Sequence, residues 1–498
     1  MSKSQDKIVF YLSLALISGL GFFLVCYCTV WGAGLISDSF QYVASARSLA
    51  AGNRLGYGDD PSHIIPLTQY PPLFSVILAI FERAGIDGFV AARFMNAALF
   101  ALNIGLIGLS IKKISHSIGF SLIGAFLITF SVVLSEAHTW VLSEPLFIFF
   151  SLLSYYWLDK YLESSNKTWL IISALAVSLA ILTRYVGLAL LPAAWIIILS
   201  KPYANLRRKW SDLGVYSLIG LIPIVLWTVK NYFESGLINN RSLQWVPLTI
   251  KNLYSLVNTL VTWFLPANLV TGRERWVIPL LLIFIIGSGL IFYFSKRKPF
   301  YNGLFLENYQ KPLFRLHTFY IFFYIIMIVA SKTLFDKNMG MTDRMLSPVL
   351  ISMIIPGSAS AASLWRRKNR LLQVLVGVSM IYLAVYFATT SLPVIEKYHR
   401  QGIGLARKSW HTSEVIQSLP QYASLPIYSN SPSTLYFWTG RMGKGVLTLD
   451  RLIQSGSNEK AILVVFYHIP PNNRIYRLEK ELKLLKSDSL AKIYLYES

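Results

Sequence analysis

Long apolar runs separated by short polar loops are the main pattern of this chain. Uncharged or nearly uncharged segments recur along the first 393 residues, and no charged residue lies between Lys7 and Asp38. A transmembrane helix needs about 20 apolar residues, since each adds about 1.5 Å and the hydrocarbon core is about 30 Å thick. The pattern predicts about eleven spans, near residues 8–30, 90–111, 117–136, 142–160, 168–184, 186–200, 212–230, 276–295, 315–332, 345–365 and 371–392.

Composition agrees with a polytopic α-helical membrane protein. Hydrophobic residues make up 54% of the 498 residues, charged residues 14%, and the mean hydropathy is +0.51. These values are too apolar for a soluble chain of this length. Both cysteines, Cys26 and Cys28, lie inside the first apolar run, which favours buried hydrophobes over a disulfide framework or a metal motif.

The formal net charge of +22 is compatible with nucleic-acid binding, but the placement of the basic residues favours another explanation. They gather in four short loops, at residues 112–116, 201–209, 296–298 and 366–370. With the N-terminus in the cytoplasm, alternating spans put all four loops on the cytoplasmic side, as the positive-inside rule requires. We therefore expect a multi-pass protein of a bacterial inner or plasma membrane that contacts membrane lipids and no nucleic acid.

The character of the chain changes near Pro393, where the last span is expected to end. Beyond it, β-rich runs at 425–429, 461–467 and 491–496 alternate with helix-like runs at 431–438 and 475–485. This alternation predicts a small α/β domain, residues 394–498, outside the membrane and after a transmembrane module of residues 1–393.

Two other segments of the transmembrane module are expected to lie at its surface. Residues 71–85 are apolar but short and begin with two prolines, which favours a re-entrant or interfacial helix over a crossing. Residues 232–275 carry Trp and Pro and are expected to form short interfacial helices.

The first external loop, residues 31–74, is the stretch with the most unusual polar residues. Asp38 is a lone acid at the mouth of the first apolar run, and an amphipathic helix is expected from Phe40 to Ala50. A polar Gly/Asp/Pro segment with His63 follows, and then Gln69 and Tyr70 precede two prolines. With the predicted topology, all of these residues face the non-cytoplasmic side.

Asp38 has two compatible interpretations. As a general base it would accept the proton of an acceptor hydroxyl, a role worth about 10²- to 10⁴-fold in rate. As an N-cap it would satisfy the free N–H groups at the start of the following helix.

Two further acids lie in LSEAHTWVLSEPLF, on the same predicted side. Glu144 precedes Pro145, so capping at the positive end of a helix dipole explains it as readily as a second site carboxylate does. That carboxylate would orient the acceptor or a metal ion. Glu136, eight positions earlier, is the weaker candidate of the two.

Three arginines at the ends of apolar segments are candidate phosphate ligands: Arg184 in LTRYVGL, Arg344 in DRMLSP and, with less support, Arg93. Guanidinium groups bind phosphate oxygens in pairs of hydrogen bonds and stabilise a phosphate leaving group. Snorkelling toward lipid headgroups is the alternative for each of them. For His63, plain solvation is the alternative.

Together these motifs resemble GT-C class glycosyltransferases, which include protein O-mannosyltransferases and lipid A aminoarabinose transferases. The resemblance begins with an acid after the first span and a Tyr-Pro-Pro-Leu element. It continues with SEPLF, LTRYVGL, DRMLSP and, in the C-terminal domain, IYSNSPSTLYFWTGR. Each motif is short, but together they extend over the whole chain.

The resemblance implies transfer of a sugar, with inversion, from a polyprenyl phosphate to a hydroxyl on the non-cytoplasmic face. By position, Asp38 matches the catalytic acid of the first loop, Glu144 is similar to the acid of the second loop, and Arg184 and Arg344 resemble the basic residues near the lipid phosphate. Gln69 and Tyr70 stand where aminoarabinose transferases have Glu-Lys. Ser39 stands where protein O-mannosyltransferases have a second acid.

The sequence thus predicts an inverting glycosyltransferase that takes a monosaccharide from a polyprenyl-phosphate donor to a hydroxyl acceptor. Asp38 and Glu144 would be its catalytic acids, Arg184, Arg344 and Arg93 its phosphate ligands, and His63, Gln69, Tyr70 and Glu136 would line the acceptor and donor sites. A divalent metal between Asp38 and Glu144 is an option that the sequence does not require. The alternative is a transporter or flippase of a lipid-linked or anionic substrate, which would show broken helices and ionisable groups near mid-membrane.

Overall fold

The computed structural model describes most of the chain, as two compact units. The described residues are 3–58, 63–202, 205–236, 238–239, 243–270, 306–335, 340–367, 369–454, 459–470 and 472–497. The helical unit comprises Met1–Cys26, Thr68–Phe74 and Phe94–Ile395; the mixed unit comprises Tyr27–Leu67, Ser75–Arg93 and Glu396–Ser498. The mixed unit therefore joins most of the first loop to the C-terminal part of the chain. The predicted division into 1–393 and 394–498 stays a prediction.

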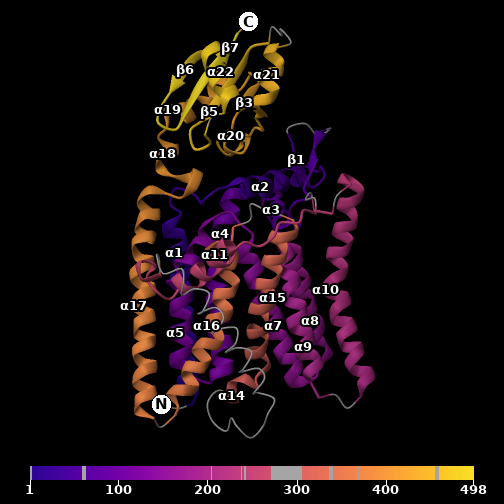
Figure 1. Ribbon diagram of the computed structural model, residues 1–498, viewed down its shortest axis with the longest axis vertical. Coiled ribbons are helices and arrows are strands. Elements are labelled where there is room, and N and C mark those ends of the chain that lie inside the picture. Colours follow the sequence, from indigo (N-terminus) through magenta and orange to yellow (C-terminus); the bar gives the residue numbers. More distant parts are fainter. Residues whose placement is uncertain are drawn as a thin grey trace. The chain divides into compact units, whose positions relative to one another are not determined.

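The helical unit is built from long apolar helices and several shorter ones (Figure 1). They are α1 (Lys3–Cys28), α4 (Gly88–Ser115), α5 (Ile118–Thr129), α6 (Val132–Thr139), α7 (Glu144–Ser164), α8 (Lys167–Thr183), η2 (Tyr185–Ala189), α9 (Leu190–Ser200), α10 (Leu206–Ser235), α11 (Ile250–Thr262), α12 (Ala267–Val270), α14 (Leu306–Tyr309), α15 (Pro312–Leu334), α16 (Asp343–Trp365) and α17 (Arg370–Gln401). The first six residues of α4, the last two of α1 and the last six of α17 belong to the mixed unit.

Among the described residues, six helices are long and apolar enough to cross a membrane: α1, α4, α10, α15, α16 and α17. The pair α5 and α6 passes the same test together but bends by 56° between them. The chain is an integral membrane protein, as predicted. The expected number of about eleven spans is not confirmed, and the predicted span at 276–295 lies outside the described residues.

A break at Arg184 explains why one apolar stretch yields short helices. The 17 residues of α8 extend about 26 Å, less than the roughly 30 Å of a hydrocarbon core. Small buried residues on α8, among them Ser173, Ala174 and Ala180, let it pack closely against α7 and α10. The Ser173 hydroxyl donates to the carbonyl oxygen of Ser154 on α7 at 2.6 Å.

The two segments expected at the surface form short helices. Helix α3 (Leu73–Arg83) has 11 residues and a length of about 16 Å, too short to cross a membrane. Helices α11 and α12 lie in the described part of 232–275, after α10 ends at Ser235. Hydrogen bonds from the Tyr386 hydroxyl on α17 to the carbonyl oxygens of Thr262 and Leu265 hold the end of α11, at 2.9 and 3.0 Å.

The first loop in the mixed unit consists of α2 (Ser37–Ala50) and a short antiparallel hairpin of β1 (Gly56–Tyr57) and β2 (Ile65–Pro66). The amphipathic helix expected from Phe40 thus starts three residues earlier. Aromatic side chains fasten the beginning of this loop to the chain after α17. The Tyr27 ring stacks on His399 at 3.8 Å between ring centres, and the Trp31 indole N–H donates to the His399 carbonyl oxygen at 3.2 Å.

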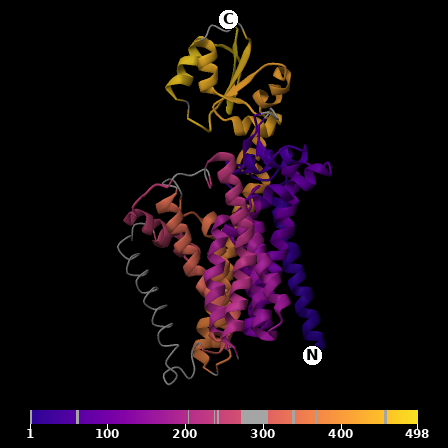
Figure 2. The same ribbon diagram turned by 90° about the vertical axis from the view of Figure 1, so that its right-hand side faces the viewer.

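The C-terminal part of the mixed unit is a five-stranded mixed sheet with helices on both faces (Figure 2). Its strands are β3 (Ile427–Ser429), β4 (Lys444–Gly445), β5 (Ala461–Phe466), β6 (Lys483–Ser487) and β7 (Ala491–Tyr496), in the order β4-β3-β5-β7-β6. Strand β3 is parallel to β4 and β5, and β7 is antiparallel to β5 and β6. The helices are η3 (Gly404–Ala406), α18 (Lys408–His411), α19 (Glu414–Ser418), η4 (Leu419–Tyr422), α20 (Pro432–Thr439), α21 (Val446–Gln454) and α22 (Asn473–Glu481).

Central strand β5 is completely buried because both of its faces are covered. Ile462, Val464 and Phe466 pack with the helices that precede α21, whereas Ala461, Leu463 and Val465 pack with α21 and α22. This arrangement explains why AILVVF is a continuous apolar run instead of an alternating one.

Helix α17 continues through Pro393 to Gln401, so the proline lies inside the helix. The end of the last span near Pro393 stays a prediction. One expected boundary in this region is wrong. The helix expected over 475–485 ends at Glu481, and Lys483–Ser487 forms an edge strand instead. Pairing with β7 overrides the helical character of that stretch, since strand formation depends on its neighbours.

Asp488, in the turn between β6 and β7, ties the sheet to α19. One carboxylate oxygen accepts from the backbone N–H groups of Leu490 and Ala491 at 2.8 and 3.0 Å. The other accepts from the Ser413 hydroxyl and from the Val415 N–H. Burial alone would raise the pKa of Asp488, but these hydrogen bonds outweigh it and hold the pKa below its ordinary value.

We expect Asp488→Asn to destabilise the C-terminal sheet at pH 7 by about 1–2 kcal/mol, reduced by solvent screening because the carboxylate is partly exposed. A depressed pKa stabilises the fold above the unfolded-state pKa of about 3.9 and loses this effect as the pH falls through the folded-state pKa. The deficit should therefore shrink below about pH 4. Thermal unfolding of the full chain in detergent measures this stability deficit, and Glu481→Gln serves as the control variant. A deficit that is equal at pH 7 and pH 3 would contradict this account.

Candidate functional site

Glu144 is a buried carboxylate at the start of α7. Pro145 occupies the first turn, where its missing N–H costs nothing, and the helix N-terminus favours the negative charge. The residue is 1% exposed. Its Oε1 lies 2.9 Å from Nη1 of Arg184 and 3.5 Å from Nε of Arg344. Among the described residues, neither carboxylate oxygen makes a well-aligned hydrogen bond, so the two cations hold it mainly by charge.

Arg184 reaches this carboxylate from the end of α8. It is the C-cap, with extended backbone angles of φ −150° and ψ 132°, and the chain continues as a 3-10 helix. The C-terminal end of a helix favours a positive charge. The guanidinium also donates from Nη1 to the Ser143 hydroxyl at 3.3 Å. Its side chain is 18% exposed.

Arg344 reaches the same carboxylate from the first turn of α16. The neighbouring Asp343 carboxylate accepts a hydrogen bond from the Trp263 indole at 2.6 Å. The Tyr324 hydroxyl of α15 donates to the Met345 carbonyl oxygen at 2.7 Å. These contacts fix the helix end that carries Arg344. The arginine thus adds its charge to the positive end of a helix dipole, and its side chain is 32% exposed.

The charges of Glu144, Arg184 and Arg344, which we call the Glu144 cluster, meet at one place. One carboxylate faces two guanidinium groups, and two helix N-termini lie at the same place. The two guanidinium groups and the two helix N-termini are the parts of this cluster that attract an anion. Such a site favours an anion with several oxygens, such as a phosphate group.

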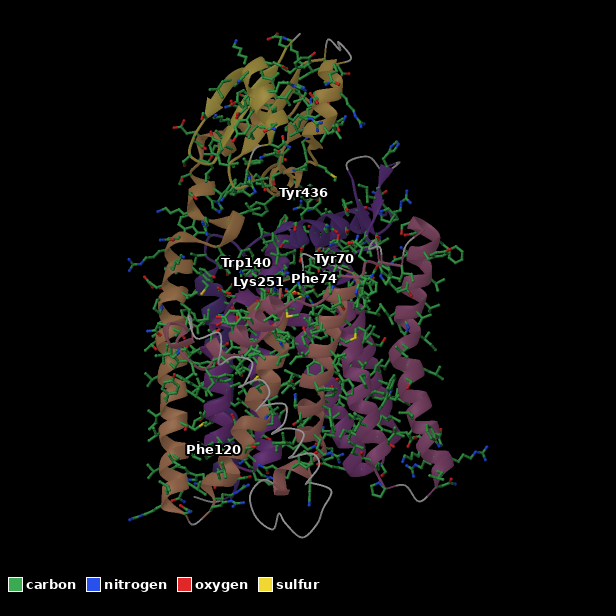
Figure 3. All side chains as sticks on the ribbon, in the orientation of Figure 1. Tyr70, Phe74, Phe120, Trp140, Lys251 and Tyr436 are labelled. Atoms are coloured by element: carbon green, nitrogen blue, oxygen red, sulfur yellow. The ribbon has the colours of Figure 1, made fainter. Side chains whose placement is uncertain are left out.

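The segment before α3 lies beside the Glu144 cluster in the helical unit. The Tyr185 hydroxyl, one residue after Arg184, donates to the Thr68 carbonyl oxygen at 3.4 Å and accepts from the Trp227 indole at 3.2 Å. Gln69 and Tyr70 follow, joined by a hydrogen bond of 3.1 Å from the Gln69 amide to the Tyr70 hydroxyl. Tyr70 and Phe74 are labelled in Figure 3.

Polar residues that the sequence did not single out support the turn before Glu144. The buried Asn103 amide of α4 lies 3.2 Å from the His138 ring and donates to the Pro145 carbonyl oxygen at 3.2 Å. The Asn96 amide donates to the Trp140 carbonyl oxygen at 2.8 Å. Asn and His side chains inside apolar helices are costly unless they are paired. Their presence in these apolar segments could therefore have marked them as structural residues from the sequence alone. Glu136 lies on α6 in the same region and is partly buried.

Asp38, His63 and Arg93 belong to the mixed unit. Asp38 is partly exposed in the first turn of α2 and accepts from the Ser37 hydroxyl at 3.4 Å. The N-cap position is Ile36, whose N–H donates to Ser39, so the capping interpretation of Asp38 is wrong. His63 is exposed, and its neighbours Asp59 and Asp60 lie outside the described residues.

Arg93, the third expected phosphate ligand, has a structural contact. Its Nε donates to the Thr29 hydroxyl at 2.9 Å, which joins the start of α4 to the end of α1.

The residues fit a divalent metal poorly. Within the described part of the chain there is no group of three or more His, Cys, Asp or Glu side chains that could hold a metal ion. Glu144 is already paired with two cations, which would repel a third. We therefore derive no step through a metal.

Comparison with solved structures identifies the fold. The structure of ArnT from Cupriavidus metallidurans bound to undecaprenyl phosphate matches with a TM-score of 0.58 and 12% sequence identity, over 99% of this chain and 98% of that one. The protein has a GT-C type fold. The predicted resemblance to GT-C glycosyltransferases is thereby confirmed at the level of the fold.

Two further comparisons bear on this GT-C chain. An oligosaccharyltransferase from Archaeoglobus fulgidus, tethered to an acceptor peptide, matches with a TM-score of 0.52 and 10% identity, over 100% of this chain and 75% of that one. Residues 69–227 match the family model described as dolichyl-phosphate-mannose-protein mannosyltransferase. That match includes Glu144 and Arg184 but neither Asp38 nor Arg344. The comparison with curated proteins gives no match.

We expect Arg184→Ala to destabilise the GT-C chain more than Arg344→Ala. Removing one partner of a buried ion pair lowers the free energy of unfolding by about 3–5 kcal/mol. Because Arg344 still faces Glu144 in Arg184→Ala, we expect a decrease of about 3 kcal/mol. Arg344 is farther from the carboxylate and more exposed, so its loss should cost about 1 kcal/mol. Thermal unfolding in detergent checks both values.

The double variant Glu144→Gln/Arg184→Ala is the matched control. It removes the buried charge together with its nearest partner, so it should recover much of the stability lost in Arg184→Ala. Equal losses for the two arginine variants would show that the 2.9 Å contact is not the dominant one.

Proposed function

We propose that this protein is an inverting glycosyltransferase of the membrane. It would transfer a monosaccharide, a hexose or a pentose, from a polyprenyl-phosphate carrier to a hydroxyl group of a lipid, glycan or protein acceptor. The observation that carries the proposal is the Glu144 cluster, in which two guanidinium groups are held between three helix ends. The GT-C fold and the family model over residues 69–227 support it. So do the undecaprenyl phosphate bound to ArnT and the acceptor peptide tethered to the oligosaccharyltransferase.

In the proposed reaction, the acceptor oxygen attacks the anomeric carbon of the sugar while the bond from that carbon to the phosphate oxygen breaks. The electron pair of the broken bond stays with the polyprenyl phosphate, which gains a negative charge. Arg184 and Arg344 would stabilise this developing charge, an interaction that is stronger in the transition state than in the ground state.

Glu144 acquires a different role from the one expected from the sequence. Its pairing with both arginines supports a function in holding the two guanidinium groups apart and in place, instead of orienting the acceptor. Fixed charges of this kind need no reorganisation when the phosphate leaves. Gln69 and Tyr70, beside the same helix ends, are proposed to line the donor site.

Asp38 is proposed as the general base that takes the proton of the acceptor hydroxyl. This role rests on the resemblance of the first loop to that of GT-C glycosyltransferases. Its partly exposed position at the N-terminal end of α2 is compatible with it, because a base must be reached by substrate. His63 and Glu136 remain proposed lining residues, and no metal is required in this scheme.

The proposed active face is the non-cytoplasmic one. The four basic loops support this assignment, because the positive-inside rule keeps them in the cytoplasm. A bacterial inner or plasma membrane is the proposed location, with the C-terminal sheet on the same side as the active site.

A transporter or flippase of a lipid-linked substrate is the second candidate. The 56° bend between α5 and α6 and the break at Arg184 favour it, since transporters use interrupted helices near their binding sites. The two candidates differ in whether a covalent bond is broken.

We expect Asp38→Asn to lower sugar transfer by about 10²- to 10⁴-fold, because the amide cannot accept the proton. The measurement is single-turnover transfer by purified protein in lipid, with a set of polyprenyl-phosphate donors. Glu163→Gln, at an exposed acid paired with Lys113, is the control and should keep full activity. Full activity in Asp38→Asn would remove Asp38 from the mechanism, and movement of the donor across the bilayer without transfer would favour the flippase.

A further inference from the structure

Arg47 fastens α2 to the turn between α3 and α4. Its Nε lies 3.0 Å from Oε1 of Glu82, and its Nη2 lies 2.5 Å from Oδ2 of Asp87. The Glu82 carboxylate also accepts from the Gly88 N–H at 2.7 Å. Asp87 accepts from the Phe89 N–H at 3.0 Å and thereby caps α4. One guanidinium group thus connects α2 to both sides of this turn.

The face of the same guanidinium lies against the C-terminal part of the mixed unit. Its Cζ is 5.3 Å from the ring centre of Tyr436 on α20 and 5.1 Å from that of Phe89. Tyr436 is labelled in Figure 3. Burial would lower the pKa of Arg47, but the interactions with Tyr436 and Asp87 outweigh it and raise the pKa above its ordinary value. The side chain therefore remains a cation while joining the loop to the sheet.

Aromatic contacts continue this connection on both sides of Arg47. The Phe40 ring meets the Tyr436 ring edge-on at 5.0 Å between centres, and Phe89 meets Phe437 in the same way at 5.0 Å. Phe40 and Arg47 are seven residues apart, which places both on one face of α2. This face is the one that packs on α20.

The side chains of α2 and α20 are not closely packed along their whole contact. An open groove of about 290 Å³ runs along it, lined by Arg47, Ser48, Asn53 and Tyr436 among others. A few side chains thus carry the connection, with Arg47 at its centre.

Asp38 lies on the same helix but on the opposite face. Nine residues separate it from Arg47, which corresponds to two and a half turns and about 14 Å along the axis. Arg47 is therefore far from the side chain of Asp38, and the two residues share only the helix that carries them.

We propose that Arg47 is a positioning residue for sugar transfer, which holds α2 and its Asp38 in a working orientation by coupling them to the C-terminal sheet through Tyr436. The inference rests on the proposed function, in which Asp38 is the base. A base must be within hydrogen-bond reach of its proton, and a displacement of about 1 Å costs about 10²-fold in rate. The C-terminal sheet then influences catalysis without touching the reacting atoms.

The test compares Arg47→Lys and Tyr436→Leu with the unchanged full-length protein in lipid. Lysine keeps the charge but lacks the planar fork that reaches both acids and stacks on the rings. We expect Arg47→Lys to lower kcat by ten- to a hundredfold and Tyr436→Leu by somewhat less, with an unchanged KM for the polyprenyl-phosphate donor. The double variant should fall no further than Arg47→Lys alone, because both changes break one connection.

Hydrogen exchange supplies a measurement that does not depend on activity. Amides of α2 should exchange faster in Arg47→Lys, while those of β5 and β7 should not. The matched control is Arg477→Lys, because the ion-pair partners of Arg477, Asp450 and Glu481, both lie in the C-terminal sheet region. This control should change neither kcat nor the exchange of α2.

The outcomes separate the inference from the proposed function. If the unchanged protein transfers sugar and Arg47→Lys transfers it at the full rate, the inference is overturned and the function stands. If kcat falls only in proportion to the folded fraction, Arg47 is merely structural and the inference is also overturned. If the unchanged protein transfers no sugar from any polyprenyl-phosphate donor, the proposed function fails, and the exchange of α2 then still shows whether Arg47 couples the helix to the sheet.

Discussion

The helical unit depends on one electrostatic constraint, the burial of the Glu144 carboxylate. An ionised carboxylate that is 1% exposed must be compensated, because its desolvation costs several kcal/mol even after the protein relaxes. The compensating cations come from α8 and α16, which lie far apart in sequence from each other and from the start of α7. Three helix ends therefore have to meet at one place.

The helix dipoles affect the three charges differently. Glu144 at the start of α7 and Arg184 at the end of α8 both have the sign that their helix end favours. Arg344, at the start of α16, has the opposite sign to the one favoured there. The end of α16 therefore does not itself favour the arginine, which makes its ion pair with Glu144 the more important for holding it in place.

Sequence reasoning identified the ionisable residues of this cluster but not the contacts that hold them. Glu144, Arg184 and Arg344 stand out because charges at the ends of apolar helices are costly. Tyr185 and Trp227 gave no such signal, since aromatic residues are common in membrane helices. Their role depends on the contact with Thr68, more than a hundred residues away. The central strands of the C-terminal sheet followed from composition, whereas edge strand β6 depends on pairing that its own sequence does not specify.

Arg47 and Glu144 are each the centre of a group of ion pairs, one in each unit. Arg47 faces two carboxylates, so the excess charge around it is negative and no further anion is favoured there. Glu144 faces two guanidinium groups, whose remaining N–H groups suit the oxygens of an anion. The same pair of functional groups thus gives a rigid joint in one unit and a candidate phosphate site in the other. Because the joint is already satisfied, substrate binding need not disturb it, and the position of α2 can remain fixed while the charge at the Glu144 cluster changes.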